Sequence, residues 1–202
     1  MDNYGTVQPV DIASMQRVFE DLLNDRNVQV QGTHWAALIN AWGCVQKDLV
    51  KAVQLFESIK NHPSSAGSKI SLPDALVLEA LVNVFVLHRR MDLAQTYLLN
   101  ATAYGVHMTA YIANLLIKGY AASDDIVSAR DIFEGLADPP AGVAAPFNHG
   151  DHGSHVPQKP YAQSNGAFVY REPSTWEAML RAELGSGNRD KALELLERLK
   201  SR

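Results

Sequence analysis

Residues 75–109 read ALVLEALVNVFVLHRRMDLAQTYLLNATAYGVHMT. Two apolar stripes follow one another in this stretch, and each has the three- and four-residue spacing of an amphipathic helix rather than the alternation of a strand. The first stripe comprises Leu78, Leu81, Val82 and Phe85, and the second comprises Met91, Ala94, Leu98 and Ala101. The polar residues 88–90 between them form a connection of the length that joins antiparallel helices. The stretch therefore predicts a helical hairpin.

The same pair of stripes recurs along the chain, which indicates a repeat protein. The predicted first helices of the hairpins start at Gly32, Ala75, Ala110 and Pro173. The two central starts lie 35 residues apart, and the other spacings, 43 and 63 residues, are longer because polar loops are inserted. A period in the thirties built from paired helices is typical of an α-solenoid. Within the stripes, Trp35 and Trp176 are predicted core residues.

Three hairpins share a further pattern of residue types. They read AYIANLLIKGYAASDDIVSARDIFEGL at residues 110–136, STWEAMLRAELGSGNRDKALELLERLK at residues 174–200, and THWAALINAW followed by KAVQLFESIK in the first full hairpin. These segments resemble the pentatricopeptide repeat, whereas the Trp-Leu-Gly-Tyr pattern of the tetratricopeptide repeat is not evident. The resemblance implies an all-α fold, namely an α-solenoid of antiparallel helix-turn-helix repeats wound as a right-handed superhelix.

We expect residues 1–202 to form a single α-solenoid. Its predicted segments are the second helix of a truncated repeat at 11–31, a repeat at 32–74 with an inserted loop at 61–73, repeats at 75–109 and 110–137, an insertion at 138–172, and a repeat at 173–202. The insertion at 138–172 is rich in Pro, Gly, His and Asn, so a disordered surface loop is expected. Because the chain opens in the middle of a repeat and ends without a polar capping helix, we expect a piece of a longer array.

Turn and capping residues mark the ends of the predicted helices. Gly105 suits a left-handed position after a helix end, and Asp124 or Asp125 can cap the helix that follows the third turn. Ser174 and Glu177 have the spacing of a capping box at the start of the last hairpin. These features place the hairpin boundaries.

The composition excludes several classes of protein. The formal net charge is −4 and the isoelectric point is near 5.9, which is the wrong sign for a strong non-specific nucleic-acid binder. The single cysteine, Cys44, rules out an internal disulfide and is expected to be a buried structural thiol. No apolar run is long enough to predict a membrane span. Residues 1–31 carry five acidic residues and only two arginines, so no import presequence is visible.

The sequence gives only weak indications of a metal site, a phosphate-binding loop or a catalytic site. One set of residues has spacings that could hold a metal ion, namely His149, Asp151, His152 and His155. This loop is rich in Gly and lacks Cys, so a solvated loop is the preferred interpretation. The Gly-Ser-Gly sequence at 185–187 suits a hairpin turn better than a phosphate-binding loop. With no recognisable nucleophile and base, we expect no catalysis, metal, cofactor, small-molecule substrate or membrane partner.

The resemblance implies single-stranded RNA as a partner. In pentatricopeptide repeats the fifth and last residues read a base, and the second residue packs against it. The fifth positions here are Ala36, Glu79, Asn114 and Glu177; the second positions are Thr33, Leu76, Tyr111 and Ser174; the last positions are Asp74 and Thr109. The candidates for phosphate contacts are Arg89, Arg90, Lys118 and Arg181.

The predicted base-reading residues mostly differ from those usual in the family, so two functions stay open. Only Asn114 is the family's common choice, Ala36 cannot hydrogen-bond to a base edge, and Glu79 would bring negative charge towards RNA. The chain is similar to divergent fungal mitochondrial members, which implies a mitochondrial location and a role in RNA processing, stability, ribosomal RNA maturation or translation. The alternative is a protein–protein interaction scaffold without RNA binding, for which aromatic residues could serve as anchors. Those anchors are Trp42, Tyr104 and Tyr111.

Overall fold

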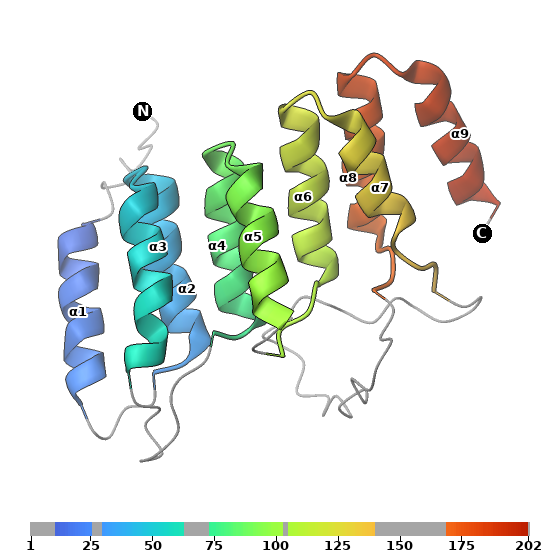
Figure 1. The fold of residues 1–202 in the computed structure, drawn as a ribbon. Helices are drawn as coiled ribbons and strands as arrows, with labels where there is room; N and C mark the ends of the chain where they lie inside the picture. The colour runs from blue at the N-terminus through green and yellow to red at the C-terminus, as the bar shows by residue number, and fades with distance from the viewer. Residues whose placement is uncertain (1–10, 26–29, 63–72, 103–104, 140–168, 202) are drawn as a thin grey trace, which may run out of the picture. The chain divides into compact units, whose positions relative to one another are not determined.

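The computed structural model describes residues 11–25, 30–62, 73–102, 105–139 and 169–201. Figure 1 shows these residues as helices, and within each hairpin a short turn joins the two helices. The helices are α1 (Ile12–Asn24), α2 (Gly32–Asn40), the π-helix η1 (Ala41–Val45), α3 (Leu49–Ser58), the 3₁₀ turn η2 (Ile59–Asn61), α4 (Ala75–Leu87), α5 (Met91–Ala101), α6 (Ala110–Ala122), α7 (Ile126–Glu134), α8 (Pro173–Gly185) and α9 (Arg189–Lys200). The described residues contain no strand, only an isolated bridge between Ala137 and Tyr170. The predicted all-α class is confirmed.

The chain divides into two compact units, Met1–Val84 and Phe85–Arg202, and the boundary falls inside α4. Each unit is built from hairpins whose first helices start where the apolar stripes predict: α2 in the first unit, α6 and α8 in the second, and α4 across the boundary. The stripes locate these starts because α2, α6 and α8 each pack against their own hairpin partner and against a neighbouring helix, which buries their apolar side chains.

Aromatic pairs form the core of the first unit. Trp35 is 4% exposed and meets the ring of Phe19 edge to face, with ring centroids 4.7 Å apart. This contact joins α1 to α2, and α3, which packs against α2, buries the side chains of Ala52 and Phe56. Trp35 is thus a core residue, as predicted.

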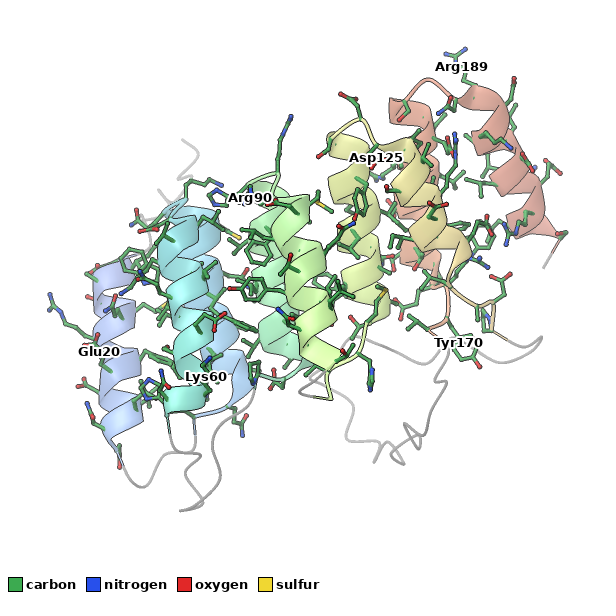
Figure 2. The ribbon with its side chains drawn as sticks, viewed as in Figure 1. Glu20, Lys60, Arg90, Asp125, Tyr170 and Arg189 are labelled. Atoms are coloured by element: carbon green, nitrogen blue, oxygen red, sulfur yellow. The ribbon has the colours of Figure 1, made fainter. Side chains whose placement is uncertain are left out.

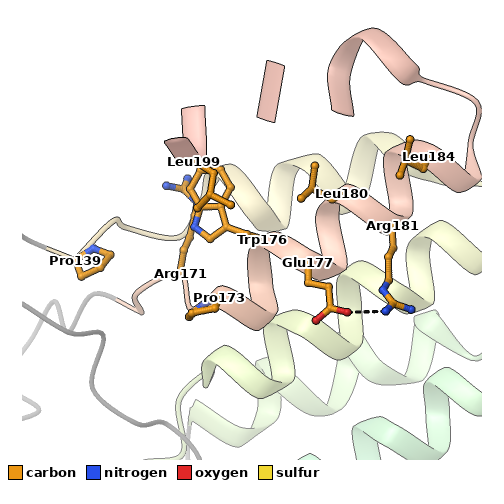
Figure 3. Close-up of a pocket in the computed structure, with 9 residues that line it drawn as sticks. All are labelled: Pro139, Arg171, Pro173, Trp176, Glu177, Leu180, Arg181, Leu184 and Leu199. Carbon is orange, nitrogen blue, oxygen red and sulfur yellow. Dashed lines mark hydrogen bonds and ion pairs between the residues drawn. The ribbon is translucent and has the colours of Figure 1, made fainter. Parts of the chain in front are cut away.

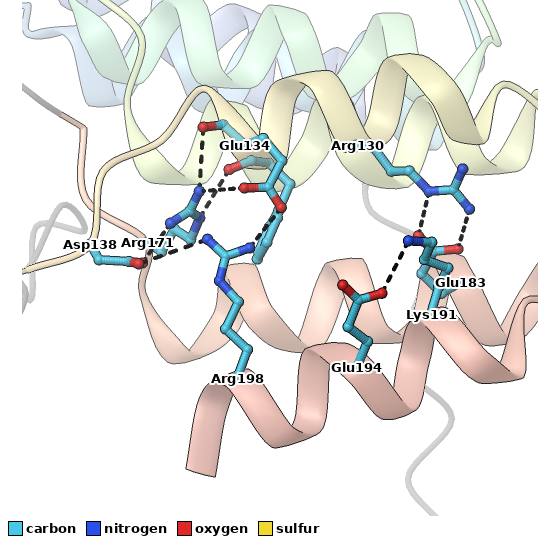
Figure 4. Close-up of polar contacts among 9 residues, drawn as sticks. Arg130, Glu134, Asp138, Arg171, Glu183, Lys191, Glu194 and Arg198 are labelled. Atoms are coloured by element: carbon cyan, nitrogen blue, oxygen red, sulfur yellow. Dashed lines mark hydrogen bonds and ion pairs between the residues drawn. The ribbon is translucent and has the colours of Figure 1, made fainter. Parts of the chain in front are cut away.

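The second unit repeats this construction around α6. Most of the surface of α6 is buried because both α7 and α8 pack against it. Trp176 is 3% exposed and meets Phe133 edge to face at 5.0 Å, which joins α8 to α7. Arg130 adds a bidentate ion pair to the buried carboxylate of Glu183, with N···O distances of 2.6 and 2.8 Å (Figure 4). Trp176 is therefore also a core residue.

The hairpin turns share one backbone conformation. The residue two positions before each second helix has a positive φ, with values of 60° at Lys47, 55° at Arg89, 60° at Asp124 and 77° at Gly187. In the last three turns, the next residue donates its N–H to a carbonyl five residues earlier, as from Asp125 to Tyr120 at 2.9 Å. In the first turn, Asp48 donates to Trp42, six residues earlier.

The first hairpin absorbs one extra residue in its π-helix. Lys47 lies 15 positions after the start of α2, whereas Arg89 lies 14 positions after the start of α4. A π-helix accommodates such an insertion as a bulge. Gly43 lies within it, and a Cβ there would come within 2.3 Å of the side chain of Val84. The bulge therefore requires a glycine where α4 approaches, a feature that the sequence analysis did not predict.

Ordered structure reaches further into the predicted 138–172 insertion than expected. Ala137 donates its N–H to the carbonyl of Val169 at 2.9 Å, and Arg171 donates its N–H to the carbonyl of Ala137 at 2.8 Å. The guanidinium of Arg171 is 4% exposed, pairs with Asp138 at 2.6 Å and donates to the carbonyl of Phe133 at 2.9 Å (Figure 4). The edges of the insertion thus belong to the folded unit, while residues 140–168, like most of the 61–73 loop, lie outside the described residues.

The capping box that opens α8 lies two residues earlier than predicted. Glu172 is the N-cap, and its N–H donates to the side chain of Thr175 at 3.2 Å, while the Glu172 side chain accepts from the N–H of Thr175. Pro173 has no N–H to satisfy and suits the first helical position, which moves the cap to the preceding residue. Ser174 and Glu177 therefore do not form the box.

The other predicted turn residues are confirmed. Asp125 caps α7 by accepting the N–H of Ser128 at 3.0 Å. Gly105 has a φ of 75° after the end of α5, in the left-handed region that glycine tolerates best.

Candidate functional site

Equivalent positions of the first helices define a candidate face in each unit. Counting from the start of each helix, positions two, five and nine are spaced by three and four residues, so they share a side of the helix. Positions two and five hold the predicted base-contacting residues. Position nine holds Asn40 in α2, Asn83 in α4, Lys118 in α6 and Arg181 in α8.

In the second unit, the structure brings a predicted reader and a predicted packing residue together. The Nδ2 atom of Asn114 donates to the hydroxyl of Ser174 at 2.9 Å, and that hydroxyl donates to Glu172 at 3.3 Å. The fifth position of one repeat thus meets the second position of the next. Asn114 is 4% exposed, and its buried Oδ1 accepts no hydrogen bond from the described residues. Asn114 therefore connects α6 to α8 and keeps one unsatisfied acceptor.

Two further candidates on α8 neutralise each other. Glu177 and Arg181 form an exposed ion pair with an N···O distance of 2.6 Å, one helical turn apart (Figure 3). Exposed pairs of this kind contribute little to stability. Arg181, the predicted phosphate-binding residue, is therefore already paired with Glu177, the predicted base-contacting residue.

Lys118 is an available cation on the same face. Its side chain is exposed at the ninth position of α6, and it makes no ion pair with any described residue. Tyr111, two turns earlier on α6, is half-buried. Lys118 could therefore meet a phosphate without first breaking an ion pair.

The two predicted arginines at the end of α4 lie in a hairpin turn. Figure 2 shows Arg90 at the start of α5, where its guanidinium binds both carboxylate oxygens of Asp92 at 2.8 and 2.6 Å. This hydrogen bonding lowers the pKa of Asp92 to about 2 and raises the pKa of Arg90. Arg89 is exposed, and its side chain makes no ion pair among the described residues.

The predicted last-position readers act as helix caps. Asp74 accepts the N–H of Val77 at 3.0 Å at the start of α4, and Thr109 accepts the N–H of Ile112 at 3.2 Å at the start of α6. Side-chain acceptors at these positions satisfy amides that the helix leaves unpaired. Asp74 and Thr109 therefore have structural roles that the sequence analysis missed.

The predicted readers of the first unit do not form a polar cluster. Glu79 is only 8% exposed, and Ala36 and Leu76 are half-buried. Thr33 is exposed at the start of α2. These positions present little hydrogen-bonding capacity at the surface.

A polar cluster does occur one helical turn away, at the ninth position. Asn83 donates its Nδ2 to Asn40 Oδ1 at 3.3 Å and lies 3.5 Å from the sulfur of Cys44. Cys44 in turn donates to Asn40 Oδ1 at 3.6 Å, and burial raises the pKa of its thiol. The recurrence of polar residues at position nine of the first helices is the sequence feature from which the Asn40–Asn83 pair could have been predicted.

An apolar groove lies on α8 and α9, with a volume of about 450 Å³ (Figure 3). Its lining residues are Pro139, Arg171, Pro173, Trp176, Glu177, Leu180, Arg181, Leu184 and Leu199. The equivalents of Trp176 and Leu180 on α6 are Ala113 and Ile117, and both are fully buried in a helix against which α8 packs. The groove is thus lined at positions that are fully buried in the preceding repeat.

Other predicted features are limited by what the structure describes. Across the described ranges, no group of three or more His, Cys, Asp or Glu side chains could hold a metal ion, and His149, Asp151, His152 and His155 lie outside those ranges. In the same ranges, no helix has the length and apolar character needed to cross a membrane. Of the predicted aromatic anchors, Tyr104 also lies outside, while Trp42 is half-buried with Lys51 over its ring at 5.8 Å.

Comparisons with known proteins agree with this geometry. A family model described as "PPR repeat" matches residues 174–202, which cover α8 and α9. The α8–α9 hairpin is thus similar to a pentatricopeptide repeat. The chain is 29% identical over 201 residues to "Pentatricopeptide repeat-containing protein 5, mitochondrial" from Schizosaccharomyces pombe. That match covers 99% of this chain and 13% of the relative, so the chain spans only a small part of that protein's length.

A solved structure supports the fold. The chain superimposes on the crystal structure of the pentatricopeptide repeat protein PPR10 from maize with a TM-score of 0.56 and 14% identity, over 94% of this chain and 22% of that one. The predicted pentatricopeptide-repeat resemblance and the helical solenoid class are confirmed.

Proposed function

We propose that this chain is a helical-repeat module of a protein that binds single-stranded RNA in mitochondria. The protein would act in transcript processing, stability, ribosomal RNA maturation or translation, by holding or remodelling RNA without bond chemistry. The resemblance to pentatricopeptide repeats supports the RNA partner, and the name of the fission-yeast relative, a mitochondrial protein, supports the mitochondrial location.

The observation that carries the proposal is the hydrogen bond between Asn114 and Ser174 at 2.9 Å. It joins the fifth position of one repeat to the second position of the next. Helical-repeat RNA readers bind one base per repeat through two or three side chains. The contact therefore puts the residues that would surround a base next to each other.

The electrostatics suggest a modest contribution to affinity from this chain. The net charge of −4 opposes RNA, and Glu177 already engages Arg181. Lys118 makes no ion pair with any described residue, so it can neutralise a phosphate, and this neutralisation releases a counterion from the RNA. We therefore expect binding that is weak and strongly dependent on salt.

The test measures binding of the full chain to a pool of short random-sequence single-stranded RNA over a salt series. Lys118→Ala should weaken binding and reduce the slope of log affinity against log salt by about 0.7, the value for one phosphate contact on a single strand. Glu177→Gln should strengthen binding because it releases Arg181. Lys191→Ala, on the exposed side of α9, is the matched control and should change neither quantity. Absence of binding at low salt would overturn the proposal.

A second candidate function is a protein-binding scaffold, which the groove on α8 and α9 favours. Its occupant would be an amphipathic helix, because the equivalent positions of the preceding repeat, Ala113 and Ile117, are buried in a helix that other helices surround. The salt series separates the two functions, since a scaffold without RNA binding retains no RNA even at low ionic strength.

A further inference from the structure

The amides of Asn40 and Asn83 hold each other in a fixed orientation. Asn40 Oδ1 accepts hydrogen bonds from Asn83 Nδ2 at 3.3 Å and from the thiol of Cys44 at 3.6 Å. The second hydrogen of Asn83 Nδ2 has the sulfur of Cys44 within reach at 3.5 Å. Because these contacts use the acceptor of Asn40 and the donors of Asn83, they also determine which amide groups remain.

The remaining groups are one amide donor and one amide acceptor. An asparagine offers two N–H donors on Nδ2 and two acceptor lone pairs on Oδ1. Asn40 Nδ2 and Asn83 Oδ1 make no hydrogen bond with any residue in the described part of the chain, and both side chains are half-buried. A partly buried pair with an open donor and an open acceptor can be completed only by water or by a ligand.

The pair lies on the candidate face at the ninth position. It is one helical turn beyond Ala36 and Glu79, the fifth positions of the same helices. Ala36 carries only a methyl group, so it cannot reach a base and does not extend over Asn40. In the second unit, the same position carries the cations Lys118 and Arg181. The ninth position thus holds a hydrogen-bonding or charged side chain in each of these first helices.

We propose that Asn40 and Asn83 together bind the edge of one nucleobase of single-stranded RNA, in place of the fifth-position residues. Every base presents a donor and an acceptor side by side on its Watson–Crick edge. Adenine and cytosine pair an amino donor with a ring-nitrogen acceptor, whereas guanine and uracil pair a carbonyl acceptor with a ring N–H donor. An amide donor and an amide acceptor held in one order therefore match one of these two sets better than the other. The inference rests on the proposed function, because it names the residues through which the first unit would contact RNA. The competing interpretation is that the pair only ties α2 to α4.

The test selects motifs from the random single-stranded RNA pool with the full chain and three variants. Asn40→Ser and Asn83→Ser should each abolish a base preference of roughly tenfold at a single motif position, the discrimination expected of one bidentate pair. Asn100→Ser, on the exposed side of α5, is the matched control and should leave the motif unchanged. An unchanged motif in both test variants, with a lowered thermal midpoint, would show a structural tie and overturn the inference while leaving RNA binding intact.

A second measurement needs no substitution and covers the case in which a variant fails to fold. In the wild-type chain labelled with ¹⁵N-asparagine, addition of the selected RNA should shift the side-chain amide signals of Asn40 and Asn83 and leave that of Asn100 in place. RNA binding without these shifts would overturn the inference alone. No RNA binding by the wild-type chain would overturn both the inference and the proposed function.

Discussion

At the residue scale, the hairpin turns show how one backbone requirement is met by different side chains. The left-handed position before the second helix is filled by Gly187 in the last hairpin but by Lys47, Arg89 and Asp124 in the others. Side chains other than glycine cost about 1–2 kcal/mol in this conformation. The last turn is therefore the least strained of these turns.

This difference predicts that Asp124→Gly stabilises the chain. The free energy of unfolding should rise by about 1 kcal/mol, because glycine removes the left-handed penalty. Denaturant unfolding measures the change. Ser123→Gly is the matched control: its φ is −101°, so glycine relieves nothing there and should be neutral or destabilising. Equal effects at the two positions would contradict this account of the turn.

At the element scale, Arg171 anchors the start of α8 to the end of α7. Its guanidinium donates to the carbonyls of Phe133 and Glu134, pairs with Asp138, and lies 4.6 Å from the ring centroid of Phe133. Removing a buried arginine leaves these acceptors without their donor inside the protein. The anchor is thus a structural part of the repeat, although it lies within the predicted insertion.

We expect replacement of the insertion and substitution of its anchor, Arg171, to have different effects on the stability of the chain. Replacing residues 140–168 with a short Gly-Ser linker should leave the thermal midpoint nearly unchanged, because the contacts that join α7 to α8 lie on either side of them. Arg171→Met should lower the free energy of unfolding by about 3 kcal/mol, the cost of breaking a buried pair. Circular dichroism melts report both outcomes. A large destabilisation by the linker would contradict the assignment of these contacts.

At the scale of the whole molecule, each unit has its own tryptophan core. Trp35 packs against Phe19 in the first unit and Trp176 against Phe133 in the second, so the ring partners in these two contacts are different residues. Substitutions that share no partners usually add in free energy. The two cores should therefore behave independently.

Trp35→Ala and Trp176→Ala should each lower the free energy of unfolding by about 3–5 kcal/mol, as expected for a buried tryptophan. The double variant should show the sum to within about 0.5 kcal/mol. A deviation well beyond that margin would reveal coupling between the two cores.

The sequence predicts the hairpins of this molecule better than its binding surface. Apolar periodicity locates the starts of α2, α4, α6 and α8 because burial of one face is a local property of each helix. The π-helix stays hidden because one inserted residue leaves the flanking stripes intact. The contacts of Asn114 with Ser174 and of Asn40 with Asn83 span 60 and 43 positions, and single-helix spacing carries no information about such pairs.

The bridge between Ala137 and Tyr170 has a practical consequence. Two backbone hydrogen bonds and the Arg171 side chain hold residues 133–137, before the undescribed segment, beside residues 169–171, which follow it. Adjacent anchor points of this kind tolerate the insertion of a foreign domain, whose own termini need only lie close together. A fluorescent reporter grafted between Pro139 and Val169 should therefore mark the protein in living cells and leave both chain ends unmodified.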